Sequence, residues 1–198
     1  MIRKANRLSL ISLTLSAGLM SSCVSTAVPT KKAAEISARS NVLADRYQSE
    51  LLTALKTAMA SGGPVAAITV CTEQSPAIAA RLSEENNAHI QRVALRWRSP
   101  AAQPTASERQ VLKSWLKAPL DPQGNPRSIV FQSGRDEVTF MRAIPLKPEC
   151  QTCHGVNIQP EIKATLAESY PDDRATGFRP GELRGAFRIV WSQPETRF

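Results

Sequence analysis

The order of the predicted elements indicates an α+β fold with an antiparallel sheet in one domain. Two long helical patterns come first, and three of the four strand patterns lie after residue 127. Two of these strand patterns are separated by a short turn that contains Ser133 and Gly134, as in a hairpin, and hairpin strands pair antiparallel. A parallel α/β sheet would instead need strands that alternate with helices along the chain. The sequence therefore predicts N-terminal helices followed by a hairpin-rich antiparallel sheet.

Three segments have the composition and spacing of helices. The apolar positions of the first, residues 33–60, recur every four residues, at Leu43, Tyr47, Leu51 and Leu55. Such a stripe usually faces a core. The second, residues 64–85, begins with Gly-Pro and is broken or restarted at Pro76. The third, residues 105–117, begins with a Thr that is typical of a helix N-cap.

The strand patterns are runs of β-branched and aromatic residues bounded by turn residues. They cover residues 89–97, 128–133, 137–145 and 183–192. A chain of 198 residues, of which 42% are hydrophobic, can bury one substantial core. We therefore expect one folded domain, over residues 35–198.

The first residues have the layout of an export signal. Residues 1–22 contain a basic start, an apolar stretch over 8–20 and then small residues, and the apolar stretch is short for a membrane-spanning helix. The small residues run into Cys23, so that "LMSSC" resembles the lipobox of bacterial lipoproteins, whose cysteine is acylated. The alternative is cleavage near residues 25–27, which would remove Cys23. With acylation, residues 23–34 form a tether between anchor and domain.

These features predict a periplasmic protein, anchored to the outer membrane through lipid on Cys23. Val24, rather than Asp, after the acylated cysteine favours outer-membrane sorting. The formal net charge is +8, which in some proteins indicates nucleic-acid binding. Here the positive charges are scattered singly on an exported chain, so we expect no nucleic-acid partner.

The segment "ECQTCHG" carries the chemistry that the sequence predicts most strongly. A CxxC pair serves as a zinc site, a redox dithiol, a structural disulfide or, with a following His, a c-type haem attachment site. Export leaves Cys71, Cys150 and Cys153, an odd number in an oxidising compartment. Neither a thioredoxin-like setting nor the usual zinc spacing is present. Haem attachment uses all the residues, with thioethers from Cys150 and Cys153 and iron ligation by His154, so one covalent haem c is predicted.

The second axial position of the iron has several candidates. They are Cys71, His89, Met20, Met59, Met141 and water, and Met20 is lost with the signal. Met59 continues an apolar stripe that is usually core, and His89 precedes a strand at a place typical of surface histidines. A buried cysteine is often only a small hydrophobic residue. An unpaired thiol in an oxidising space is open to oxidation unless something occupies it, which favours Cys71.

Four segments together resemble a family of exported c-type haem proteins of unknown function. They are "VCTEQSPAIAARLS", "RWRSPAAQP", "CQTCHG" and "YPDDRATGFRPGELRGAFRIVW". The family has a PAS-like fold and His/Cys axial ligation, and it also forms the sensory module of some signal transducers. The resemblance covers residues 35–192 and implies thioethers from Cys150 and Cys153, proximal ligation by His154 and distal ligation by Cys71.

Two arginines are candidates for binding the haem propionates. Arg96 and Arg98 flank Trp97 on a predicted strand, so they share one face, and guanidinium groups bind carboxylates through charge-assisted hydrogen bonds. The alternative is a solvated strand face. Nearby, Ser99 and Ala102 stand where the family pattern has asparagines, which removes any hydrogen bonds that those amides provide.

His/Cys ligation predicts a non-enzymatic role. A thiolate ligand stabilises Fe(III), which implies a low reduction potential, and two protein ligands leave no iron position for a substrate. The sequence therefore predicts electron transfer or redox sensing with a protein partner. The alternatives are a haem-based gas sensor, in which Cys71 leaves the iron, and a peroxidase-like enzyme.

Overall fold

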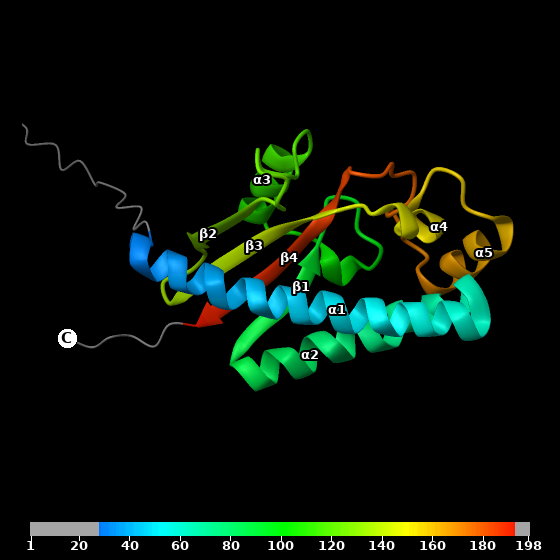
Figure 1. The fold of residues 1–198 in the computed structure, drawn as a ribbon, viewed down its shortest axis with the longest axis horizontal. Coiled ribbons are helices and arrows are strands. Elements are labelled where there is room, and N and C mark those ends of the chain that lie inside the picture. The colour runs from blue at the N-terminus through cyan, green and yellow to red at the C-terminus, as the bar shows by residue number, and fades with distance from the viewer. Residues whose placement is uncertain (1–27, 193–198) are drawn as a thin grey trace, which may run out of the picture.

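The computed structural model describes residues 28–192 and has the α+β architecture that the sequence predicts (Figure 1). One antiparallel sheet has the strand order β1-β4-β3-β2. The strands are β1 (Ala88–Val93), β2 (Ser128–Gln132), β3 (Glu137–Pro145) and β4 (Leu183–Ser192). Helices lie against both faces of the sheet. This single-domain arrangement is consistent with the PAS-like fold that the resemblance implies.

The N-terminal helices form a long hairpin. Helix α1 (Thr30–Thr69) is kinked at Gly63, whose φ of 70° glycine adopts easily, and the following proline restarts the helix. A π-helical turn, η1 (Val70–Gln74), then leads into α2 (Ser75–Asn86). Pro76 lies in the first turn of α2, directly after the π-helical turn, and its missing N–H interrupts the regular helical hydrogen-bond ladder there. Both predicted interruptions are confirmed, although α1 begins three residues earlier than predicted.

One core lies between this hairpin and the sheet. The predicted stripe on α1 contributes Leu43 and Tyr47, which pack with Leu82 of α2. Phe140 and Ile189 of the two central strands face them and are fully buried. Helices cover both faces of the middle strands β3 and β4, and most residues of these two strands are therefore buried.

Helix α3 (Ala106–Trp115) covers the opposite face of the sheet. Its Leu112 and Trp115 pack against Met141 of β3. The predicted Thr N-cap is confirmed: Thr105 accepts a hydrogen bond from the Glu108 backbone, and the Glu108 carboxylate accepts one from the Thr105 N–H. This reciprocal capping box defines where the helix begins.

The predicted hairpin is confirmed, whereas the first predicted strand ends early. In the hairpin, Ser133 and Gly134 both donate backbone N–H bonds to the Glu137 carbonyl. The strand predicted over residues 89–97 is wrong beyond Val93. The Ala94 N–H donates to Ala102 at the end of η2 (Pro100–Ala102), not to β4. The chain therefore leaves the sheet there.

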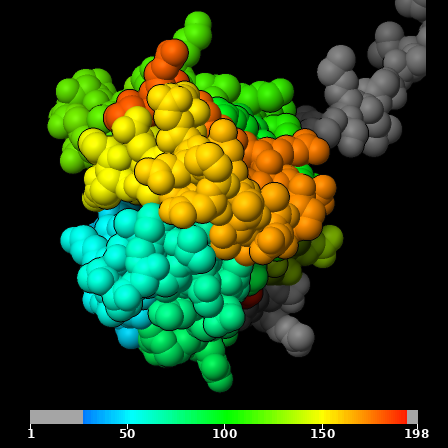
Figure 2. Space-filling model, turned by 90° about the vertical axis from the view of Figure 1, so that its right-hand side faces the viewer, coloured from blue at the N-terminus to red at the C-terminus, as the bar shows by residue number. Residues whose placement is uncertain are grey.

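The end of the molecule beyond α1 contains three short elements. They are η3 (Pro148–Cys150), α4 (Gln151–His154) and α5 (Pro160–Ser169). Helix α5, which the sequence analysis did not predict, buries Ile162 and Leu166 against Ile68 near the end of α1. These contacts place the CxxCH segment beside the tip of the helical hairpin (Figures 1 and 2).

We expect Ser40→Ala to destabilise the fold. The buried indole N–H of Trp191 donates to the Ser40 hydroxyl at 2.8 Å, and alanine would leave this N–H unpaired. An unsatisfied buried donor costs about 1–3 kcal/mol, so the free energy of unfolding measured with urea should fall by that amount. Ser49→Ala, at an exposed position of the same helix, is the control. Equal small effects of both substitutions would contradict the expectation.

Candidate functional site

The CxxCH segment forms a tight helical turn. Cys150 and Cys153 are three residues apart across η3 and α4, so their side chains lie on one side of the turn. The turn closes with a hydrogen bond from the Gly155 N–H to the Gln151 carbonyl at 2.8 Å. A Cβ at position 155 would lie 2.6 Å from this carbonyl oxygen, so only glycine fits the closure.

A segment that precedes β4 holds this turn in place. The Phe178 N–H donates to the His154 carbonyl at 2.9 Å, and the Gly177 N–H donates to the Gly155 carbonyl at 2.8 Å. Gly177 has a φ of 75°, which favours glycine. These bonds join the CxxCH turn to residues far along the chain.

The His154 imidazole is oriented by a backbone carbonyl. Its Nδ1 lies 2.7 Å from the Ala175 oxygen, and since a carbonyl only accepts, Nδ1–H is the donor. Burial, and then the charges of Arg184 and Arg98, hold the pKa of His154 well below its usual value. The ring is therefore neutral, with Nε2 available as a ligand atom, as in many metal-ligating histidines.

Arg98 and Asp173 form an ion pair behind the cysteines. Their nitrogen and oxygen atoms are 3.1 Å apart, and their side chains are only 9% and 10% exposed. Arg98 also donates to the Cys153 carbonyl at 2.6 Å. Asp173 accepts the Ala175 N–H at 2.7 Å, so this pair orients both the second cysteine and the carbonyl that binds His154. The predicted role of Arg98 toward propionates stays a prediction.

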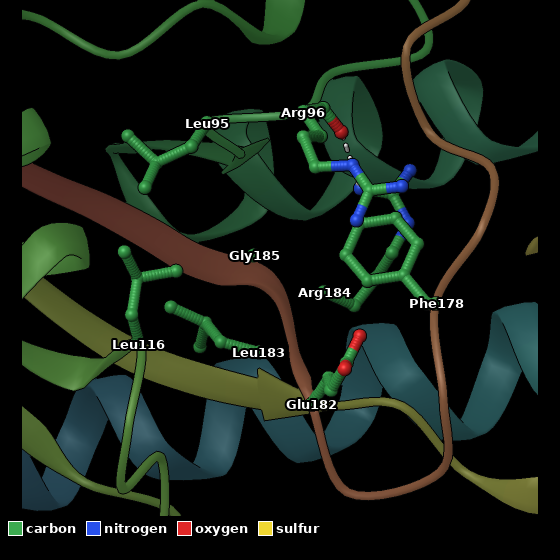
Figure 3. Close-up of a pocket in the computed structure, with 8 residues that line it drawn as sticks. All are labelled: Leu95, Arg96, Leu116, Phe178, Glu182, Leu183, Arg184 and Gly185. Atoms are coloured by element: carbon green, nitrogen blue, oxygen red, sulfur yellow. Dashed lines mark hydrogen bonds between the residues drawn. The ribbon is translucent and has the colours of Figure 1, made fainter.

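The other predicted arginine points to a cavity. The Arg96 guanidinium lies 3.9 Å from the centre of the Phe178 ring and its Nε donates to the Arg174 carbonyl at 3.4 Å. Arg96 lines a cavity of about 260 Å³ together with Arg184 (Figure 3). Its predicted role also stays a prediction.

Cys71 lies on η1 and comes close to the CxxCH turn. Burial is the main cause that raises the pKa of Cys153 and of Tyr170, the latter to about 12, and Cys71 contributes to both shifts. Ile68, three residues before Cys71, packs in the same cluster as Cys153 and Tyr170. The tip of the helical hairpin and the CxxCH end lie side by side (Figure 2). The structure therefore brings together two predicted ligands that are distant in sequence.

The three thiols of the site are free and partly accessible. Cys71, Cys150 and Cys153 are half-buried and form no disulfide. Burial raises the pKa of Cys150 as well as that of Cys153. A second cavity, of about 470 Å³, lies beside the turn, and its lining includes Pro64 of α1 and Gln151 of the turn. These thiols are available for thioether bonds.

The other candidate ligands lie elsewhere in the fold. His89 is exposed at the start of β1, Met59 is 40% exposed on α1, and Met141 is fully buried beneath α3. Met20 and the predicted lipid site Cys23 lie outside the described residues. Within residues 28–192, no three His, Cys, Asp or Glu side chains are grouped closely enough to hold a metal ion.

The donor set fits a covalently attached haem. It has two free thiols within one turn, a neutral imidazole with a free nitrogen and a third thiol alongside. The sequence analysis did not single out the positioning residues Asp173 and Ala175. The available signal was the acidic segment "PDD" at residues 171–173 together with the basic segment "RWR" at residues 96–98.

We expect Arg98→Met to destabilise the protein strongly. It would leave Asp173 as a buried charge without its partner, which costs about 3–5 kcal/mol. Thermal or urea unfolding measures the loss, and Arg98→Lys should recover only part of it because lysine lacks the forked donors. Arg179→Met, at an exposed position, is the control. A loss no larger than that of the control would show that the ion pair contributes little.

Comparison with known proteins gives two matches. The family model named Tll0287-like matches residues 24–192. The crystal structure of the cyanobacterial heme-protein Tll0287 is similar in fold, with a TM-score of 0.62 and 23% sequence identity. The alignment covers 81% of this chain and 96% of that one. No curated protein matches.

Proposed function

The chain belongs to the Tll0287-like family, and from this premise we propose that it carries one covalently attached haem c and acts in electron transfer or redox sensing. The structural relative is a cyanobacterial heme-protein. One observation supports the proposal most strongly: Cys71 lies beside the CxxCH turn although about 80 residues separate them in the sequence. This position puts a third free thiol near the pair of cysteines that precedes His154.

The residues of the site have distinct roles in this proposal. Cys150 and Cys153 would provide the two thioether bonds, and His154 Nε2 and the Cys71 sulfur would be the protein ligands of the iron. Haem bound here supplies a one-electron Fe(III)/Fe(II) couple. The Ala175 carbonyl would strengthen His154 as an iron ligand because it accepts a hydrogen bond from Nδ1–H. The anionic Cys71 sulfur would favour the oxidised state and lower the reduction potential.

The same ligand pair argues for a role without catalysis. With His154 and Cys71 both bound, no iron position is free for a substrate. A sensing role has one further supporting feature, since Cys71 lies on the π-helical turn η1, and such turns are frequent at functional sites. Release of Cys71 on reduction would then couple the redox state to the helical hairpin.

We further propose that the protein is exported to the periplasm and held at the outer membrane by lipid on Cys23. The basis is the signal layout of residues 1–22 and the lipobox-like "LMSSC". An anchored protein would meet its redox or signalling partner at the membrane surface. Cys23→Ser should move the protein from the membrane fraction to soluble or unprocessed material.

Optical spectra of the purified protein in both oxidation states test the proposed function. We expect a low-spin haem in the oxidised protein, with a thiolate-to-iron charge-transfer band, and a midpoint potential below those of His/Met cytochromes. A protein purified with stoichiometric zinc and no haem would refute the proposal. A high-spin oxidised haem that binds peroxide would instead favour the peroxidase-like alternative.

A further inference from the structure

A cavity beside the CxxCH turn combines apolar walls with two guanidinium groups. Its volume is about 260 Å³. Leu95, Leu116 and Leu183 form the apolar part, and Arg96 and Arg184 lie at the other side with Phe178 (Figure 3). The sequence analysis did not single out Arg184, which is the second residue of β4.

The two guanidinium groups are held against the same aromatic ring. That of Arg96 lies 3.9 Å and that of Arg184 5.5 Å from the centre of the Phe178 ring. Arg184 also donates from Nη1 to the Arg96 carbonyl at 3.1 Å. Cation–π contacts and one backbone bond fix the orientation of both groups, but they do not neutralise two like charges placed side by side.

Neither guanidinium group is paired with a carboxylate in the described part of the chain. The nearby Asp173 is paired with Arg98. Glu182 lines the cavity, but its Oε2 accepts the backbone N–H of Arg179 at 3.0 Å. Arg96 is exposed and Arg184 is half-buried, and a partly buried cation normally has an anionic partner, so Arg184 in particular is suited to bind an added carboxylate.

The charges that act most strongly on Arg184 are positive. Burial, followed by the charges of Arg92 and Arg98, lowers the pKa of Arg184 to about 9, and only Asp173 and Cys71 act in the opposite direction. Arg184 is nevertheless partly accessible, because it faces the cavity. An anion that entered the cavity would therefore reach its guanidinium directly.

The cavity adjoins the proposed haem site. Phe178, on which both guanidinium groups lie, donates its backbone N–H to the His154 carbonyl, and the Arg184 charge contributes to the lowered pKa of His154. Haem carries two propionate carboxylates, and arginine binds carboxylates in a bidentate manner. A propionate therefore has both the charge and the covalent tether that suit this position.

We propose that the cavity between Arg96 and Arg184 binds a carboxylate, that this carboxylate is a haem propionate, and that Arg184 is its principal partner. The inference rests on the proposed function, since it needs haem at the CxxCH turn. It assigns Arg184 a role in binding and in tuning the redox potential: a cation near the iron favours the reduced, less positive state. Arg98, whose Nε and Nη2 donate to Asp173 and to the Cys153 carbonyl, then acts mainly as a positioning residue.

Resonance Raman spectra of the intact haem-loaded protein test the assignment. We expect the propionate bending bands to shift in H2O against D2O, because the guanidinium protons exchange. In Arg184→Gln the bands should move to lower frequency and the midpoint potential should fall. Arg184→Lys should restore part of both changes, and Arg179→Gln, which removes an exposed arginine from the preceding loop, should leave both unchanged.

Three results would overturn the assignment. The first is covalent haem with propionate bands that neither shift in D2O nor respond to Arg184→Gln; the D2O measurement needs only the wild-type protein. The second is a raised melting temperature in acetate or succinate that disappears in Arg184→Gln while the propionate bands stay unchanged, since the cavity then binds a dissolved carboxylate. The third is wild-type protein without covalent haem, read from the denatured chain, which refutes the proposed function as well.

Discussion

Replacing Cys150 and Cys153 together by alanine should abolish covalent haem attachment. Both thiols are free and lie within one helical turn of His154, and a c-type haem is held by two thioether bonds from such a pair. The denatured wild-type chain should keep its haem absorption after acid–acetone extraction. The double variant should lose essentially all of it.

Thr152→Ala is the matched control for this experiment. Thr152 lies between the two cysteines and lines the neighbouring 470 Å³ cavity, so it reports any general disturbance of the turn. It should retain covalent haem. If the wild-type haem is extractable, or if the double variant keeps a covalent chromophore, the attachment site has been assigned wrongly.

Replacing Cys71 by alanine should remove one protein ligand of the iron and let external ligands bind there. Cys71 is the third free thiol beside the turn, and the alternatives His89, Met59 and Met141 lie at an exposed strand end, on an exposed helix face and in a sealed core. The oxidised variant should lose its low-spin spectrum and its thiolate charge-transfer band. Its affinity for cyanide should rise at least tenfold, or about 1.4 kcal/mol.

Two further variants identify the cause of this change. Thr72→Ala alters the next residue of the same π-helical turn and should leave the spectrum unchanged. Cys71→Met should raise the midpoint potential, because a neutral thioether favours Fe(II) relative to a thiolate. A Cys71→Ala protein with an unchanged oxidised spectrum would mean that Cys71 is only a small packing residue, and the sensing hypothesis would lose its mobile ligand.

Several features of the fold followed from local patterns. The i+4 stripe of α1, the Gly-Pro interruption, the Thr105 cap and the Ser-Gly hairpin all depend on residues within a few positions of one another. Propensity and periodicity describe such short-range effects. The first strand was predicted too long because the partner of the Ala94 N–H is Ala102, and a local pattern does not show that loss of ladder pairing.

The residues of the site also fall into two groups, those predicted from local spacing and those identified only by their contacts in the structure. The CxxCH spacing is local, so the sequence predicted the attachment residues Cys150, Cys153 and His154 without any structure. The ion pair of Arg98 and Asp173 and the bond from His154 to Ala175 join residues that are far apart. Each forms only because the loop before β4 packs against the CxxCH turn.

The sequence alone therefore predicted the class of chemistry, the α+β order of elements and the candidate thiols, since each depends on residue type and short spacing. Only the tertiary structure decided which groups surround that chemistry. It placed Cys71 beside the turn, bound Nε and Nη2 of Arg98 to Asp173 and the Cys153 carbonyl, and set Arg184 beside Arg96 in a cavity where neither forms an ion pair within residues 28–192. The reason is physical: charges and hydrogen-bond donors act through distance in space, and the packing of α1, β4 and the CxxCH turn sets those distances.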